Sequence, residues 1–137
     1  MVYEALFQKF VTSSNTLCVY KGDKLIFSSE KETLLPLIEY LGKYGSRHRN
    51  VVVFDKILGR AAALLCIKAR CREVYSPLGS QLGIKTLDEH GITHHITQVV
   101  DCIMQDNGVD MCPMEKLSLG KNAEEFFSAV SSIIKVK

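Results

Sequence analysis

The sequence has no long hydrophobic run and no excess of charge of one sign. Hydrophobic residues make up 47% of the 137-residue chain, but they nowhere form the uninterrupted stretch of about 18 residues that a membrane-spanning helix needs. The 17 basic and 15 acidic residues leave a net charge of only +2. This near balance does not favour nucleic acid as a partner, and the basic turn at 46–50 has few aromatic residues near it for stacking on bases. We therefore expect neither a membrane nor a nucleic acid as a partner.

The N-terminus also lacks the features of an export signal. Glu4 and Lys9 interrupt its apolar stretch, and it has no basic start. We therefore expect a cytoplasmic location. The cysteine count is odd, and we interpret these residues as reduced thiols; they are Cys18, Cys66, Cys71, Cys102 and Cys112. Their spacing fits no common zinc motif, so we predict no metal site and no cofactor.

Hydrophobic periodicity predicts alternating helices and strands. A helix is expected over 3–11, and two strands at 16–20 and 24–29 flank a tight turn typical of a hairpin. The further predicted elements are a helix from about 29 to 44, a strand at 51–54, a helix at 58–69, a strand at 72–77, a helix at 80–91, a strand at 92–98, a short helix at 99–104 followed by a loop, and a terminal helix over 121–136. This order predicts one α/β domain over residues 1–137, with three α/β/α layers and a mixed sheet of about five strands.

The stretch "VVVFDKILGRAAALLC" (51–66) contains the first candidate binding residues. Asp55, Lys56, Gly59 and Arg60 fall between a buried strand and the first turn of a helix. Ligands of open α/β sheets gather at such strand ends, and a helix N-terminus favours an anion. The alternative is structural: Asp55 caps the helix, Arg60 pairs with Asp55, and Gly59 allows close packing.

The stretch "DMCPMEK" (110–116) contains the candidate catalytic residues, Cys112 and Glu115. Cys112 would be a thiolate nucleophile if Lys116 or Arg60 lowered its pKa, and Glu115 would be an acid or base. The alternative is that Cys112 is a buried small residue and Glu115 caps a backbone group or pairs with a base.

The phrases "VVVFDKILGRAAALL", "EVYSPLGSQ" and "MCPMEK" together resemble the DUF1893 or TM1506-like family of uncharacterised prokaryotic proteins. That family is placed in the cytidine deaminase-like superfamily. The resemblance runs from about residue 16 to the terminal helix and implies a cytidine deaminase-like fold.

A zinc deaminase needs a His or Cys near a Glu at one helix start, and Pro-Cys-x-x-Cys at the next. Three ligands hold the metal, which activates a water. Set against this pattern, Lys56 takes the proline position, and Ile57 and Arg60 take those of the two cysteines. Neither can hold zinc, so the canonical reaction is not expected.

These observations lead to three functional hypotheses. The first is a zinc-independent protein that binds a small anionic or nucleotide-like molecule at Asp55, Lys56, Gly59 and Arg60. The second is a non-catalytic homodimer formed through Ala61–Ala63 or through apolar residues of the terminal helix. The third is a cysteine-based enzyme that uses Cys112 and Glu115.

Overall fold

The computed structural model describes residues 2–105, 108 and 110–134. Its elements, in chain order, are α1 (Val2–Thr12), β1 (Leu17–Lys21), β2 (Lys24–Ser29), α2 (Leu35–Tyr44), β3 (Val51–Asp55), β4 (Ile57–Leu58), α3 (Arg60–Lys68), β5 (Cys71–Ser80), α4 (Gln81–Glu89), β6 (Thr93–Val100), α5 (Pro113–Ser118) and α6 (Ala123–Ile133). No helix within the described residues has the length and apolar character needed to cross a membrane.

The strands form one mixed sheet. β1 pairs antiparallel with both β2 and β3, whereas β5 pairs parallel with β3, β4 and β6. Phe54 lies opposite Tyr75 and Ile57 lies opposite Leu78, so β4 continues along the same edge of β5 as β3, in the same register. The predicted mixed α/β sheet, parallel after the hairpin and covered on both faces, is confirmed, with the two-residue β4 as an addition.

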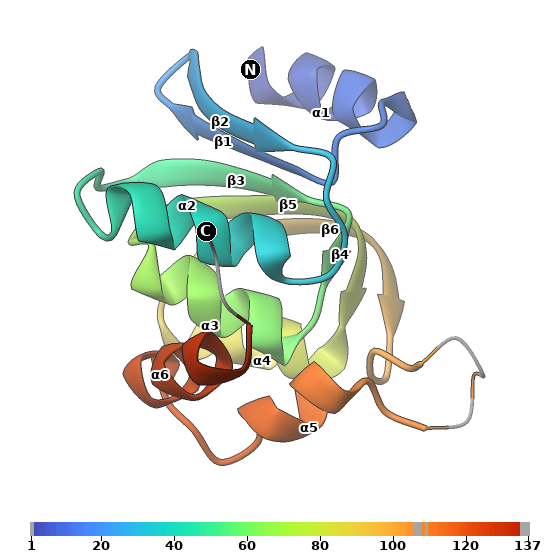
Figure 1. The fold of residues 1–137 in the computed structure, drawn as a ribbon. Coiled ribbons are helices and arrows are strands. Elements are labelled where there is room, and N and C mark those ends of the chain that lie inside the picture. Colours follow the sequence, from blue (N-terminus) through green and yellow to red (C-terminus); the bar gives the residue numbers. More distant parts are fainter. Residues whose placement is uncertain (1, 106–107, 109, 135–137) are drawn as a thin grey trace.

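The two faces of the sheet are covered unequally. In Figure 1, α1 lies alone above the sheet, and α2 to α6 lie on the opposite side. The α1 face is aromatic: the rings of Phe7 and Phe10 pack against Phe54 at centroid distances of 5.7 and 5.6 Å. Edge-to-face packing of this kind adds to the hydrophobic gain of burial, and it fixes α1 over β1, β3 and β5.

Helix α3 lies at the centre of the other face. It contacts α2, α4, α5 and α6, and every residue from Ala61 to Cys66 is buried. Three consecutive alanines present no long side chain, so neighbouring backbones approach closely on all sides. The small-residue face predicted as a possible dimer contact is therefore part of the protein core.

Three predicted boundaries are wrong. The short helix predicted at 99–104 does not form, because β6 continues to Val100 and pairs with Ser80. The loop predicted before the terminal helix contains α5, whose first turn accommodates Pro113, the position at which proline is tolerated in a helix. For the same reason α2 begins at Leu35, just before Pro36, and not near Ser29. Residues 106, 107 and 109 of the predicted loop and 135–136 of the predicted terminal helix lie outside the described residues.

Candidate functional site

The predicted binding residues lie where β3 ends and α3 begins. Asp55 is the last residue of β3, Lys56 separates β3 from β4, Gly59 is the N-cap of α3, and Arg60 is its first residue. This junction, from 55 to 60, is at the carboxyl end of the central parallel strands. The location is the one at which α/β sheets bind ligands.

The N-terminus of α3 is capped by a carboxylate of the same chain. Oε2 of Glu115 accepts a hydrogen bond from the backbone N–H of Arg60 at 3.0 Å, and Oε1 accepts one from Ala61 at 2.8 Å. Glu115 belongs to α5 and is only 3% exposed. It satisfies two of the N–H groups that a helix leaves unpaired at its start, and its charge suits the positive end of the helix dipole. The position predicted for an external anion is thus filled by Glu115.

Gly59 provides the space for this carboxylate. A Cβ atom at this position would lie 2.6 Å from the carboxyl carbon and from both carboxyl oxygens of Glu115. The backbone of Gly59 is extended, with φ −96° and ψ −171°, a conformation open to any residue. The requirement for glycine is therefore one of space and not of backbone angle.

Arg60 makes its hydrogen bonds inside the fold. Its guanidinium donates to the carbonyl of Ser118 at 3.2 Å, to Oγ1 of Thr86 at 2.8 Å and to the carbonyl of Lys121 at 2.8 Å. These partners belong to α5, to α4 and to the segment before α6. Arg60 therefore ties three segments together, and its hydrogen bonds go to these oxygens and not to Asp55.

Lys56 points into the other layer. Its ammonium donates to the carbonyl of Ser13 at 2.7 Å and lies 4.9 Å from the centroid of the Phe10 ring. Both contacts are on the α1 side of the sheet. Lys56 and Arg60 are four residues apart in the sequence, but they contact different layers and do not converge on one ligand.

Asp55 is the residue of this junction whose pKa is shifted. Burial raises its pKa from 3.8 to about 7, although the N–H groups of Ile57 and Lys56 act to lower it. The N–H of Ile57 lies 3.4 Å from Oδ1. A carboxyl with such a pKa changes its charge close to neutral pH, which is the property expected of an acid or base in this range.

Cys112 is the half-buried N-cap residue of α5, and its side chain makes no capping hydrogen bond. It lies three positions before Glu115 in the chain. The guanidinium of Arg60, one of the two cations expected beside the thiol, is held by the oxygens of three other residues. The catalytic roles of Cys112 and Glu115 stay predictions.

A second candidate site, absent from our predictions, lies at the other end of α3. A cavity of about 320 Å³ is lined by Ser46, Ile67, Lys68, Arg70, His90, Asn122, Ala123 and Glu124. Lys68, Arg70 and His90 come from the ends of α3 and α4, so their distance in the sequence concealed their proximity. One feature of the sequence could have indicated this site: basic residues stand at the end of each helix, Lys68 and Arg70 for α3 and His90 for α4. We call this the basic cavity.

Metal ligands are not gathered anywhere in the described part of the chain: no three His, Cys, Asp or Glu side chains are placed to hold an ion. The neighbouring residues His94 and His95 diverge, as expected for a strand. Nε2 of His94 lies 2.9 Å from Asp88 of α4, and Nε2 of His95 lies 2.6 Å from Glu73 of β5.

We predict that Gly59 and Glu115 are energetically coupled. Gly59→Ala should displace the Glu115 carboxylate and leave two buried N–H groups unpaired, at a cost of about 2–4 kcal/mol of unfolding free energy. In a Glu115→Ala background the added methyl group occupies vacated space, so its cost should fall by about 1–3 kcal/mol. Urea denaturation of the two single variants and the double variant measures this coupling.

Gly42→Ala is the matched control, because a Cβ there meets nothing within 4 Å. In α2 this change should be neutral or should stabilise by up to about 1 kcal/mol. Additive costs for Gly59→Ala and Glu115→Ala would contradict the coupling.

We predict that Asp55 makes stability fall as pH rises from about 4 to about 7. In this range the folded protein keeps a proton that the unfolded chain has released, because the pKa of Asp55 is raised to about 7 on folding. Asp55→Asn has no such proton but keeps an oxygen for the Ile57 N–H. The Tm of this variant minus that of the wild type should therefore increase from about pH 4 to about pH 7 and then level off.

Asp23→Asn, in the exposed β1–β2 turn, changes the net charge equally and is the control. Thermal unfolding at intervals between about pH 4 and pH 8 measures both differences. If the difference in Tm between Asp55→Asn and the wild type stayed constant with pH, this would contradict the raised pKa.

Comparison with known proteins identifies the family. The family model described as "Domain of unknown function (DUF1893)", TM1506, matches residues 6–134. A comparison with curated proteins found no match. The crystal structure of a DUF1893 family protein (TM1506) from Thermotoga maritima is similar, with a TM-score of 0.83 and 26% sequence identity. The similarity covers 97% of this chain and 88% of that chain. The chain therefore belongs to the DUF1893 family, a family of unknown function.

Proposed function

We propose that the protein binds a small anionic molecule, such as a nucleotide, and does so without zinc-dependent deamination. The observation that carries this proposal is the basic cavity. Lys68 and Arg70 contribute two positive charges to its lining, and His90 adds an imidazole. Glu124 is the one acidic residue among the lining residues.

The size and charge of the basic cavity suit a phosphate-bearing ligand. Its volume of about 320 Å³ is at the lower end of the range of small-molecule sites, which is roughly 300–1,000 Å³. Nζ of Lys68 lies 2.6 Å from Oε1 of Glu124, but the Glu124 side chain is 74% exposed. Because exposed ion pairs contribute little to stability, a ligand phosphate can replace this carboxylate at low cost.

The surroundings of the basic cavity add to its positive character. Ser46, which lines it, belongs to the same turn as Arg47 and Arg49. Nδ1 of His90 donates to the carbonyl of Thr86 at 3.0 Å, so Nε2 is the ring nitrogen left for a ligand.

The junction at 55–60 is the other location for an anion, on a scaffold that we propose is cytidine deaminase-like. An anion at the start of α3 must displace Glu115, since that carboxylate already accepts the N–H groups of Arg60 and Ala61. Zinc does not fit this junction either: Ile57 offers no ligand atom, and Arg60 carries a guanidinium held by three oxygens. In the basic cavity only the exposed carboxylate of Glu124 has to move, so we favour it over the predicted residues Asp55, Lys56, Gly59 and Arg60.

We predict that AMP and inorganic pyrophosphate raise the Tm, whereas adenosine, which lacks the phosphate, does not. At about 100 times its Kd a ligand stabilises the fold by about 2.7 kcal/mol, which corresponds to a shift of several degrees. The combined change Lys68→Ala and Arg70→Ala should abolish the shift. The control combines Lys9→Ala with Lys24→Ala, which removes the same charge from exposed positions outside the basic cavity. This control should leave the shift in Tm unchanged.

Glu115→Ala distinguishes the two locations, because it frees the N–H groups at the start of α3. If the ligand binds in the basic cavity, the AMP shift of this variant should equal that of the wild type. A larger shift in Glu115→Ala, with no loss in the Lys68/Arg70 variant, would instead place the ligand at the junction. An unchanged Tm with both AMP and pyrophosphate would contradict the proposed function.

Strand β6 favours a second candidate function, a homodimer. Among the described strands it pairs only with β5, so its outer edge offers unpaired backbone groups to another strand. Antiparallel pairing of two β6 strands about a two-fold axis would extend the sheet across both copies. The apolar terminal-helix residues predicted for this role are less suitable, because Phe126 and Val130 are fully buried.

We predict that Val99→Lys converts such a dimer into a monomer. Val99 is 45% exposed on β6, and Leu25, equally exposed on the opposite edge strand β2, is the matched control. Light scattering at micromolar concentration should give a dimer mass for the wild type and for Leu25→Lys. A monomer mass for the wild type would contradict this candidate.

A further inference from the structure

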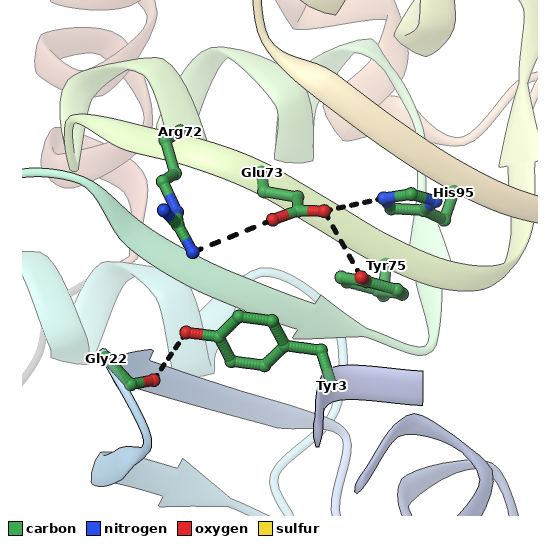
Figure 2. A network of polar contacts seen from close by, with 6 residues as sticks. All are labelled: Tyr3, Gly22, Arg72, Glu73, Tyr75 and His95. Atoms are coloured by element: carbon green, nitrogen blue, oxygen red, sulfur yellow. Dashed lines mark hydrogen bonds and ion pairs between the residues drawn. The ribbon is translucent and has the colours of Figure 1, made fainter. Parts of the chain in front are cut away.

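A network of polar groups lies between β5 and β6 on the α1 face (Figure 2). Oε2 of Glu73 accepts hydrogen bonds from Nε2 of His95 at 2.6 Å and from the hydroxyl of Tyr75 at 3.2 Å. Oε1 of Glu73 lies 3.9 Å from the guanidinium of Arg72. Figure 2 shows Arg72 and His95 approaching the carboxylate from opposite sides. Both oxygens of the Glu73 carboxylate therefore have partners, and the hydrogen bond to Glu73 holds the imidazole of His95 in one orientation.

The orientation of His95 determines which nitrogen is left for a ligand. Because a carboxylate only accepts, Nε2 carries the hydrogen in this contact, and Nδ1 of the neutral ring is an acceptor. Within the described part of the chain Nδ1 makes no hydrogen bond. The side chain of His95 is 42% exposed, so an incoming molecule can reach the ring.

Stacked rings make His95 part of a rigid aromatic surface. Its ring lies parallel to that of Tyr75, with centroids 4.1 Å apart and an interplanar angle of 17°. Tyr75 is 4% exposed, and its ring packs against Phe7 at 5.4 Å. Burial and the neighbouring Glu73 raise the pKa of Tyr75 to about 12, so its hydroxyl remains a donor to Glu73 at neutral pH.

A cavity of about 250 Å³ opens beside this surface. Its lining includes the aromatic residues Phe7, Tyr75 and His95 together with Glu4 and Gln8. Glu4 and Gln8 are four residues apart on α1, so they lie on one face of that helix, one turn apart. The cavity thus combines flat apolar surface with hydrogen-bond acceptors and a negative charge. None of its lining residues belongs to the basic cavity.

We infer that this cavity binds a planar nitrogen heterocycle that carries an amino group or a positive charge. The partly exposed ring of His95, stacked on Tyr75, offers a flat surface for stacking. Glu4 accepts from the amino group and balances its charge. Nδ1 of His95 and the amide of Gln8 accept from the ring N–H groups. Aromatic stacking and contacts between cations and rings both favour such a ligand. This site is separate from the proposed anion site and does not depend on it.

NMR titration with 2-aminobenzimidazole, a planar cation, tests the inference. The ring C–H signals of His95, assigned by their loss in His95→Gln, should move upfield as the probe stacks on the imidazole. Benzoate, which is planar and anionic, and cyclohexylamine, which is cationic but not planar, should leave these signals in place. Equal responses to all three probes, or no response to 2-aminobenzimidazole, would overturn the inference.

Matched variants test the residues. His95→Gln keeps a donor for Glu73 but removes the ring, and should weaken binding about three- to tenfold, as expected for one lost stacking contact. Glu4→Gln, at an exposed position, should weaken binding to a similar extent without disturbing the fold. His94→Gln changes the adjacent histidine, which contacts Asp88, and should leave the affinity unchanged. A loss in His94→Gln equal to that in His95→Gln, or none in both His95→Gln and Glu4→Gln, would contradict the assignment.

Discussion

The contact between the Glu115 carboxylate and the first N–H groups of α3 is the constraint on which the helical side of the fold depends. Helix α3 contacts α2, α4, α5 and α6, and the only polar groups at its start are backbone N–H groups and Arg60. Glu115 pairs with those N–H groups, and Arg60 pairs with oxygens of the segments on either side. Removing Glu115 would leave unpaired donors in the interior, which is costly. Gly59 and α5 are thus parts of one cap.

This cap also determines where an anion can bind. A helix start that faces the carboxyl end of a sheet is an attractive anion site, but here the chain supplies the anion itself. The cations near this start are likewise used within the fold: Arg60 bonds to α4 and α5, and Lys56 contacts Phe10 of α1 and the carbonyl of Ser13 just after it. The amino ends of the same strands have a different distribution of charge. There Lys68, Arg70 and His90 line a cavity that has one acidic residue in its lining. Charge and open volume therefore coincide at the opposite end of α3 from the predicted junction.

The local elements could be predicted from the sequence, whereas the contacts between distant segments could not. The hairpin, β3, α3 and the capped terminal helix follow from periodicity and from residues such as Asn122, which forms a capping box with Glu125. Neither hydrophobic periodicity nor secondary-structure propensity indicates that Glu115 accepts a hydrogen bond from the backbone of Arg60, 55 residues earlier in the chain. The end of β6 was missed for a related reason: Val99 and Val100 suit a strand or a helix in a short run, and only their pairing with β5 decides between them.

Neighbours in the sequence are poor guides to a shared site at strand ends, because successive side chains of a strand point to opposite faces. His94 and His95 illustrate this rule: one contacts Asp88 of α4, and the other joins Glu73 of β5 on the α1 face. Asp55 and Lys56 diverge in a similar way, since Lys56 reaches Ser13 while Asp55 turns back on the N–H of Ile57. In contrast, Tyr75 and His95 are twenty positions apart and directly opposite in the sheet, and their rings stack. Register, which only the folded sheet supplies, therefore decides which chemical groups can act on the same molecule.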